Sequence, residues 1–420
     1  MARILSVFFV VLLTSCFYFP FTVKALPGVN SKMIVAFFGL CLYIYNLAKV
    51  RSGNFNKDTF QLSIYAMFVS LISLFAVTYN NTSDYTFTTY FISMWVWLGA
   101  AYAVVFCIRK IHKDVSVYLV GNYLIAACLF QCFMALLIDA VPSVKLFVNT
   151  FFNLGSDYLD KVNRLYGIGA ALDVAGTRFT AVLIIIAAIL PRLRDRKLIP
   201  VYVFAFLFIA VVGNMIARTA TVGLLLGLFL LVWETKVLTF RFLPEYNKLW
   251  GWIGSLSAIG VLFIAYLCVA NENVYHDISY AFEGFFSLAE KGSWQVSSNE
   301  ILMRMYVFPE TMKTWLLGDG YFDNPVSTDP YFTGRVTAGF YMGTDVGYLR
   351  YIYYFGLIGL LAISAVFCKA TNICMSRFHD YRKMFLLLLA VNFIVWFKVS
   401  TDMFPAFAAF LLIDADDGKE

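Results

Sequence analysis

Apolar runs follow one another along almost the whole chain, and one polar stretch interrupts them. About a dozen runs lie between Ile4 and Leu412, and several, such as Ser116 to Ile138, are long enough to cross a bilayer as a helix, which takes about 20 residues. A backbone in lipid must satisfy its own hydrogen bonds, and long unbroken runs do so as helices rather than as barrel strands. The pattern therefore predicts an all-α polytopic membrane protein.

The same pattern predicts about 11 or 12 transmembrane helices and three regions. The expected spans are 4–23, 33–48, 60–78, 89–108, 116–140, 168–190, 199–214, 219–233, 250–270, 346–368, 383–398 and 402–414, of which the last two are short enough to be one broken helix. We interpret the first span as an uncleaved helix, because its apolar run continues past Cys16. Residues 1–270 would hold helices 1–9, 271–345 one large loop with short helices, and 346–420 helices 10–12 and a short cytoplasmic tail.

Composition supports a membrane protein and argues against two kinds of site. Hydrophobic residues make up 61% of the chain, and its mean hydropathy is +0.76, which is high for a soluble domain. None of the eight cysteines lies in 271–345, so no disulfide framework is expected there. Three histidines are too few to suggest a His-rich metal site.

Charge predicts the orientation of the chain. If the N-terminus is cytoplasmic, the expected inner loops are rich in Lys and Arg, as the positive-inside rule requires. The segment 272–345 has four basic and ten acidic residues, a net charge of −6, and would lie in the periplasm. We therefore expect a bacterial inner-membrane protein whose basic face meets the anionic lipids of the bilayer.

The short inner loops exclude several classes of function. None exceeds about 16 residues, whereas a P-loop or Rossmann unit needs about 30. The positive charge sits at the membrane surface rather than on a cytosolic domain, so it does not indicate a nucleic-acid partner. If the protein is an enzyme, its substrate is expected to arrive already activated on the outer side.

Four arginines on the expected outer half are candidates for an anion site. Arg178 must lie within the sixth span, because the apolar run after it supplies only about 18 Å of helix. An arginine at such depth is a functional candidate, and its planar fork suits phosphate. The alternative is that each arginine snorkels to the headgroups. The four candidates are Arg164, Arg178, Arg218 and Arg304.

Two further patterns concern helices outside the long spans. Ser297 and Glu300 have the spacing of a capping box, and an apolar stripe continues from Ile301 to Trp315, with a kink expected at Pro309. Lys398 and Asp402 are one turn apart if the chain is helical there, which predicts a structural ion pair.

Several segments, taken in order, resemble the O-antigen polymerase and ligase superfamily. The resemblance covers about 164–360. It rests on Arg164-Leu-Tyr-Gly167 and Ala175-Gly-Thr-Arg178, on the turn Ile216-Ala-Arg218-Thr-Ala220, on Ser297-Ser298 with Arg304 and the later Leu316-Leu-Gly-Asp-Gly320, and on Asp345-Val-Gly-Tyr348 with Gly356 and Gly359. Ligases of the family carry a histidine where this chain has Asp345, so the chain looks more like a polymerase.

The resemblance implies a membrane-embedded glycosyltransferase fold of the GT-C type. The implied activity is polymerisation of undecaprenyl-pyrophosphate-linked oligosaccharide units, donor and acceptor alike, into O-antigen or a similar surface polysaccharide, with a chain-length regulator as a further partner. The four arginines would bind the pyrophosphate. No Asp-x-Asp pair lies on the outer side, since Asp414 and Asp416 fall in the expected inner tail, so neither a metal nor another cofactor is expected.

Three carboxylates are candidates for the catalytic base. Asp345 leads, with Glu300 and Glu310 as rivals, because a base must accept the proton of the acceptor hydroxyl. The alternative for Asp345 is a helix cap. For the whole protein the alternatives are an O-antigen ligase and a flippase for lipid-linked oligosaccharides.

Overall fold

The computed structural model describes residues 2–50, 57–155, 159, 164–237, 243–324 and 339–413. Within these ranges, eight helices are long and apolar enough to cross a membrane, and two apolar helices are shorter. The prediction of an all-α polytopic membrane protein is therefore confirmed in this coarse form, while the total of 11 or 12 spans stays a prediction. The Asp414-Ala-Asp416 segment lies outside the described residues.

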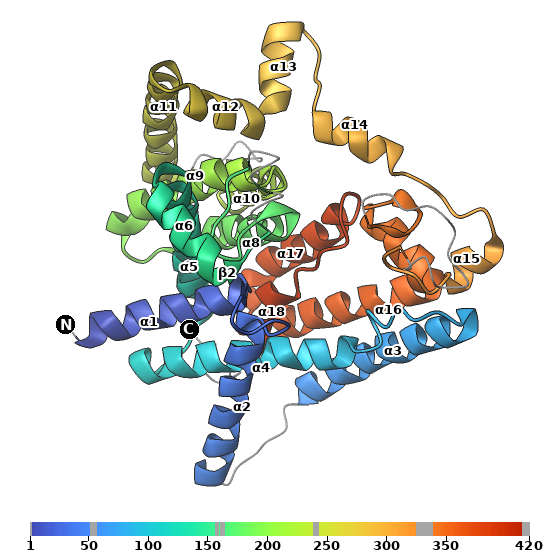
Figure 1. Ribbon diagram of the computed structural model, residues 1–420. Helices are drawn as coiled ribbons and strands as arrows, with labels where there is room; N and C mark the ends of the chain where they lie inside the picture. The colour runs from blue at the N-terminus through green and yellow to red at the C-terminus, as the bar shows by residue number, and fades with distance from the viewer. Residues whose placement is uncertain are drawn as a thin grey trace.

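The chain order of the elements follows the hydropathy pattern closely (Figure 1). The first half comprises α1 (Ala2–Tyr18), β1 (Thr22–Val23), α2 (Ser31–Val50), α3 (Lys57–Asn80), α4 (Tyr90–His112), α5 (Val117–Ala140), α6 (Pro142–Phe151), β2 (Phe152–Asn153), α8 (Leu172–Ile189), the 3-10 turns η1 (Leu190–Arg192) and η2 (Arg196–Leu198), and α9 (Ile199–Ile216). The second half comprises α10 (Ala220–Glu234), η4 (Pro244–Tyr246), α11 (Asn247–Ala270), α12 (Glu272–Ala281), α13 (Glu283–Lys291), α14 (Ser297–Arg304), α15 (Met312–Leu317), η5 (Tyr341–Gly343), α16 (Gly347–Arg377), η6 (His379–Tyr381), α17 (Arg382–Val395) and α18 (Phe404–Leu411). The two short strands pair antiparallel.

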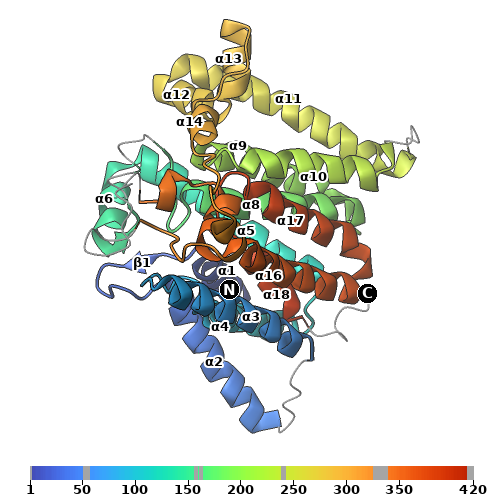
Figure 2. The ribbon, with the colours of Figure 1, turned by 90° about the vertical axis from the view of Figure 1, so that its right-hand side faces the viewer.

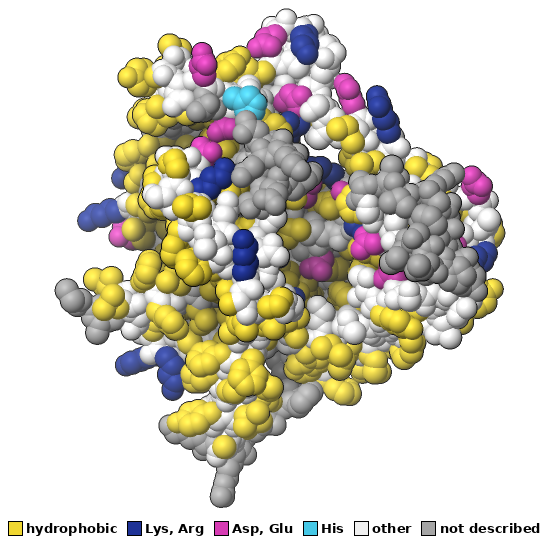
Figure 3. Space-filling model, in the orientation of Figure 1, with side chains coloured by type: hydrophobic (Ala, Val, Ile, Leu, Met, Phe, Trp, Pro, Cys, Tyr) yellow, Lys and Arg dark blue, Asp and Glu magenta, His cyan; other side chains and the backbone are white. Residues whose placement is uncertain are grey.

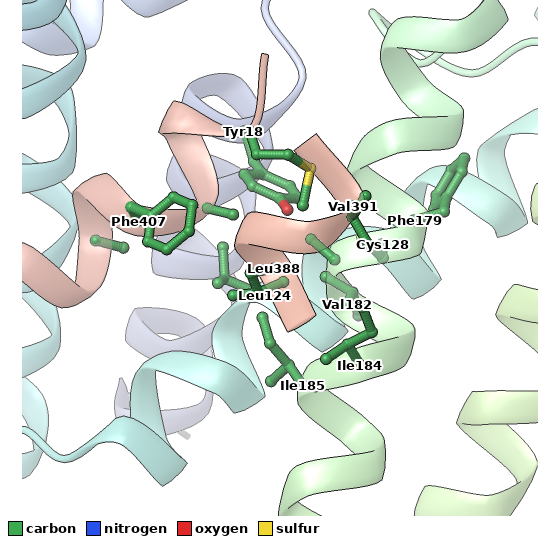
Figure 4. Packing of buried hydrophobic residues seen from close by; sticks show 14 of the residues in the cluster. Tyr18, Leu124, Cys128, Phe179, Val182, Ile184, Ile185, Leu388, Val391 and Phe407 are labelled. Carbon is green, nitrogen blue, oxygen red and sulfur yellow. The ribbon is translucent and has the colours of Figure 1, made fainter. Parts of the chain in front are cut away.

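Helix α8 is the centre of the bundle. In its apolar 18-residue window 94% of the residues are buried, whereas none is buried in the corresponding window of α11. A helix that is apolar on every side is stable only where other helices surround it. Helix α8 packs against α5, α9, α10 and α17, and Figure 4 shows Leu124 and Cys128 of α5 and Leu388 and Val391 of α17 around Val182 and Ile185 of α8.

Two glycines bring α8 close to α10 and to the turn that precedes α10. A Cβ atom on Gly223 would lie 2.4 Å from the Cα of Thr180, and one on Gly176 would lie 2.8 Å from the Cβ of Ala217. Small residues let helix backbones approach closely in membranes. The hydroxyl of Thr180 donates to the carbonyl of Thr219 at 2.9 Å and fixes the turn beside α8.

The C-terminal region does not form the continuous helix that would pair Lys398 with Asp402. Helix α17 ends at Val395 and α18 begins at Phe404, and the connection 396–403 is not helical. Asp402 accepts a hydrogen bond from the backbone of Phe404 at 3.1 Å, and Lys398 binds Asp173 instead. The predicted ion pair is wrong because the chain leaves the helix before it reaches Lys398.

The polar segment after α11 is partly helical, as expected, and α12, α13 and α14 lie together beyond one end of α9 (Figures 1 and 2). Charged side chains gather over α13 and α14, while hydrophobic ones cover much of α2 and α3 (Figure 3). This contrast is what a boundary between solvent and lipid requires.

The capping box and the single kinked helix predicted within this segment are wrong. The N-cap of α14 is Val296, and Ser297 donates its hydroxyl to Glu283 at 3.1 Å. Helix α14 ends at Arg304, and α15 begins only at Met312. Proline lacks a backbone N–H and disfavours helix in the residue before it. Around Pro309 the segment therefore forms two separate helices rather than one kinked helix.

Candidate active site

Asp345 lies just before α16, next to an arginine in the first turn of that helix. Its Oδ1 is 3.6 Å from Nη1 of Arg350, whose side chain is only 8% exposed. Nη2 of Arg350 also contacts Oδ1 of Asp323 at 2.6 Å, and Nη1 donates to Oγ of Ser400 at 3.0 Å. The guanidinium therefore joins α16, the loop segment before it and the α17–α18 connection.

The environment of Asp345 suits a proton acceptor. Burial raises the pKa of its carboxyl to about 6, against the lowering effect of Arg350. A group with a pKa near neutrality can be unprotonated and still take a proton at physiological pH. Val346, not Asp345, is the N-cap of α16, and the cap has no side-chain hydrogen bond. The cap alternative for Asp345 is therefore not what the structure contains.

A second carboxylate lies close to Asp345 and is held by a lysine. Nζ of Lys398 is 2.6 Å from Oδ1 of Asp173 at the start of α8. The hydroxyl of Thr219 donates to the same oxygen, and Nζ of Lys398 also reaches that hydroxyl at 3.4 Å. Asp173 raises and Lys398 lowers the pKa of Asp345, so the two groups are within electrostatic reach of it.

We call the set Asp173, Thr219, Asp345, Arg350 and Lys398 the polar centre. Four separate elements supply it: α8, the α9–α10 turn, the start of α16 and the α17–α18 connection. It lies where the ends of apolar helices meet the polar segment. Such an enclosed set of charges with a perturbed carboxyl is a candidate functional site.

Arg178 belongs to a different set of charges, within the helices. Its side chain is 8% exposed and faces the rings of Phe19 and Trp97 at 5.6 and 5.9 Å. Nζ of Lys32 lies 4.0 Å from the centre of the Trp97 ring. The carboxylate of Asp402 interacts electrostatically with both cations. We call Lys32, Arg178 and Asp402 the deep cluster.

The deep cluster has more positive than negative charge and an unused donor. It contains two cations and one carboxylate. Within the described part of the chain, Nε of Arg178 is buried without a hydrogen-bond partner. A buried donor left unpaired is costly. This cluster is therefore suited to receive an anion that supplies acceptor oxygens.

Arg218 and Arg164 meet at one tyrosine of the polar segment. The guanidinium of Arg218 lies 3.9 Å from the Tyr280 ring, and that of Arg164 lies 5.3 Å from it. Arg218 also forms an ion pair with Glu283 at 2.6 Å and donates to Ser298 at 3.1 Å. These contacts use Arg218 to hold α12, α13 and α14 against the α9–α10 turn.

The remaining candidates lie apart from both charge sets. Arg304 is exposed at the end of α14, and Glu310 is exposed before α15. Glu300 lies with Arg218 in a cleft of the polar segment. Among the described residues, none of the three forms a hydrogen bond or ion pair with the polar centre. The four arginines thus form one pair around Tyr280, one buried member and one exposed member, rather than a single site.

Sequence reasoning missed the roles of Asp173, Lys398, Arg350 and Lys32. A signal existed, because ionisable residues at or within apolar runs are functional candidates by default. Lys398 and Asp173 are 225 residues apart, however, and nothing local indicates that they pair. In the part of the chain that the structure describes, no group of three or more His, Cys, Asp or Glu side chains has metal-binding geometry.

Comparisons with known proteins identify no relative. No protein-family model, no curated protein sequence and no solved structure matches the chain. The function must therefore be argued from the site itself.

Proposed function

We propose that this chain is a bacterial inner-membrane glycosyltransferase that polymerises undecaprenyl-pyrophosphate-linked oligosaccharide units into O-antigen or a similar surface polysaccharide. The observation that carries the proposal is the polar centre, in which Asp345 has a pKa of about 6 beside Asp173, Lys398 and Arg350. The proposed architecture is of the GT-C type, with the N-terminus in the cytoplasm and 271–345 in the periplasm.

In the proposed reaction, Asp345 takes the proton of the acceptor hydroxyl. The acceptor oxygen forms a bond to the anomeric carbon of the donor sugar, and the bond from that carbon to the pyrophosphate oxygen breaks. Polyprenyl pyrophosphate leaves as an anion. Fixed positive charges aimed at a developing anion typically make the largest contribution to such catalysis. Protein cations in this role need no metal.

The deep cluster is our proposed site for the pyrophosphate. Arg178 and Lys32 supply the charge, and the unpaired Nε of Arg178 supplies a donor. The connection 396–403 links the two sites, because Lys398 binds Asp173, Ser400 binds Arg350, and Asp402 interacts with the deep cluster. A leaving group held there would thus contact the segment whose Lys398 and Ser400 reach the polar centre with the candidate base.

Two of the arginines expected to bind pyrophosphate are not part of this proposed pyrophosphate site. Arg218 holds the polar segment through Glu283 and Tyr280. Arg304 is exposed on α14. Arg164 stays a candidate, because it lies within electrostatic reach of Asp173 as well as of Tyr280.

An apolar groove supports a substrate with a hydrocarbon chain. A volume of about 490 Å³ lies between α2 and α4 and is lined by side chains such as Phe37, Leu40 and Ile92. Its lining begins at Met33, the residue after Lys32 of the deep cluster. A polyprenyl tail in this groove would leave its pyrophosphate near Lys32.

The experiment is a polymerisation assay with purified protein. The substrate is an undecaprenyl-pyrophosphate-linked repeat unit, and products are separated on a gel in the presence of EDTA. We expect a ladder of extended lipid-linked glycans. In a parallel reaction with lipid A core added as acceptor, transfer of a single block to that core without a ladder would instead identify a ligase.

A flippase is the second candidate, and the deep cluster is the observation that favours it. A transporter of the same lipid would also need buried cations for the pyrophosphate. Deletion of the gene in the native strain separates the three functions. Single-repeat surface bands indicate a polymerase, bare lipid A core with completed polymer on its carrier indicates a ligase, and lipid-linked units trapped on the cytoplasmic side indicate a flippase.

A further inference from the structure

A cleft of about 510 Å³ lies within the polar segment, between α12, α13 and α14. Ligand pockets typically have volumes of about 300–1,000 Å³. Its walls carry three aromatic rings, from Tyr275, Tyr280 and Phe286, and two exposed carboxylates, from Glu290 and Glu300. Arg218 of the α9–α10 turn closes one side.

Internal hydrogen bonds and the contact of Arg218 with the Tyr280 ring fix the cleft walls. The buried hydroxyl of Ser287 donates to the carbonyl of Gln295 at 2.8 Å and accepts from the backbone N–H of Gln295 at 2.9 Å. Glu283 joins Ser297 to Arg218, through contacts of 3.1 and 2.6 Å. The cleft is therefore preformed, and a ligand would lose little binding energy in ordering it.

One wall combines an aromatic ring with a carboxylate. The rings of Tyr275 and Phe286 meet edge to face at 5.9 Å, and the hydroxyl of Tyr275 donates to Glu290 at 3.4 Å. Aromatic side chains offer an apolar face together with a polar edge, and an ionised carboxylate only accepts hydrogen bonds. A sugar ring is complementary to such a wall, since its C–H face is apolar and its hydroxyls are donors.

The net charge of the cleft favours a neutral glycan over a phosphate as its ligand. The charge of Glu283 is neutralised by its ion pair with Arg218. When His276 is neutral, the other charges that line the cleft are the carboxylates of Glu290 and Glu300 and the ammonium group of Lys291. The remaining net charge is −1, which repels pyrophosphate but not a neutral oligosaccharide. The pyrophosphate and the sugar would thus occupy different places.

The α9–α10 turn connects this cleft to the polar centre. Arg218 lines the cleft, and the next residue, Thr219, donates to Asp173 in the polar centre. Successive side chains of one turn thus serve the two sites. A glycan in the cleft would extend towards the carboxyl of Asp345 from the periplasmic side.

We propose that the cleft between α12, α13 and α14 binds the neutral sugars of an oligosaccharide substrate, by ring stacking on Tyr275 and hydrogen bonds to Glu290. This inference rests on the proposed function, because it assigns the cleft to the glycan part of the substrate of that reaction.

The test measures binding and polymerisation separately. The probe is a soluble single-repeat oligosaccharide, released by mild acid from the surface polysaccharide of the native strain, and its binding to the purified full-length protein is measured by titration calorimetry. We expect Tyr275→Ala and Glu290→Gln each to weaken binding about tenfold or more, and Tyr275→Phe to keep most of it. Glu272→Gln is the control, because Glu272 is an exposed acid of the same helix α12 outside the cleft.

The two assays distinguish failure of the cleft from failure of the proposed function. If wild type polymerises lipid-linked units but the oligosaccharide binds equally well to the Tyr275→Ala and Glu290→Gln variants, or not at all, the cleft assignment is wrong and the function stands. If binding depends on both side chains but no ladder forms, the cleft assignment stands and polymerisation is wrong. If tighter binding of inorganic pyrophosphate displaces the oligosaccharide from the cleft, the charge argument is overturned.

Discussion

At the scale of single residues, burial and partners decide which charged side chains are available for chemistry. Arg218 and Arg178 are both arginines on the expected outer half, yet Arg218 has three protein partners and Arg178 keeps a buried donor unpaired among the described residues. Burial also separates Asp345 from the exposed Glu310, because it raises the pKa of the Asp345 carboxyl. Residue type alone does not separate these cases.

The first prediction concerns the pH dependence of Asp345. A base must be unprotonated to act, so we expect kcat/KM to be constant above about pH 7 and to fall about tenfold per pH unit below the pKa of about 6. Asp345→Asn should be folded and at least about 100-fold slower, because an amide cannot take the proton. The measurement is the rate of glycan extension from pH 5 to 8. Near-normal extension by the Asn variant would remove Asp345 as the base.

The second prediction concerns Arg178. Arg178→Lys keeps the charge but loses the bidentate fork, and we expect it to raise KM for the lipid-linked substrate about tenfold or more. Arg194→Ala is the matched control, since Arg194 is exposed at the other end of the bundle, after α8. Both variants are first checked for a single peak in size-exclusion chromatography. An unchanged KM for Arg178→Lys would assign the deep cluster a structural role only.

At the scale of elements, breaks in helices place the site. Helix α16 departs from helical geometry at Phe355 and Gly356, and α15 packs at that point. Gly356 has a φ of +69°, and a Cβ there would lie 2.1 Å from the carbonyl oxygen of Leu316. The connection 396–403 is the second break, and it carries Lys398 and Ser400 into the polar centre.

The third prediction tests the break in α16. Gly356→Ala puts a side chain at a backbone conformation (φ +69°, ψ −173°) that is essentially restricted to glycine, which costs about 1–3 kcal/mol, and the clash with Leu316 adds to this. We expect a lower thermal unfolding midpoint in detergent. Gly260→Ala in α11 is the control, because its Cβ would meet nothing within 4 Å and alanine favours helix by about 1 kcal/mol. Equal midpoints for the two variants would contradict the close packing of α15 on α16.

At the scale of the whole molecule, the distribution of charge predicts an orientation in the membrane. The polar segment that bears α12, α13 and α14 is acidic, and the expected inner loops are basic. Two of the expected inner ends are also tied together, since Arg377 at the end of α16 pairs with Asp58 at the start of α3, at 2.6 Å. One face of the bundle is thus suited to the cytoplasmic leaflet and the other to the periplasm.

The fourth prediction tests this orientation in spheroplasts. In a background with the native cysteines replaced, Ser293→Cys should react with a membrane-impermeant maleimide, and Asp195→Cys should react only after the membrane is opened. Both positions are exposed in the structure, so accessibility to the reagent depends on the side of the membrane. Labelling of Asp195→Cys together with protection of Ser293→Cys would invert the topology and exclude a periplasmic site.

The sequence by itself determined the membrane class, the positions of most helices and the depth of Arg178. Each of these depends on hydropathy summed over adjacent residues, which is a local property of the chain. It also marked the polar segment and its partly helical character. The candidate base Asp345 was found because it stands at the border between a polar segment and an apolar run.

Only the tertiary structure decided which charges meet. Asp173 and Lys398 are 225 residues apart, and Arg218 lies in the α9–α10 turn whereas Glu283 lies in α13, so no periodicity indicates either pair. The break at 396–403 turned Lys398 towards α8 and away from Asp402, and Pro309 ended a stripe that looked continuous. Pairing between distant residues depends on how helices pack and where they break, and the apolar side chains that set this packing are nearly interchangeable in a sequence pattern.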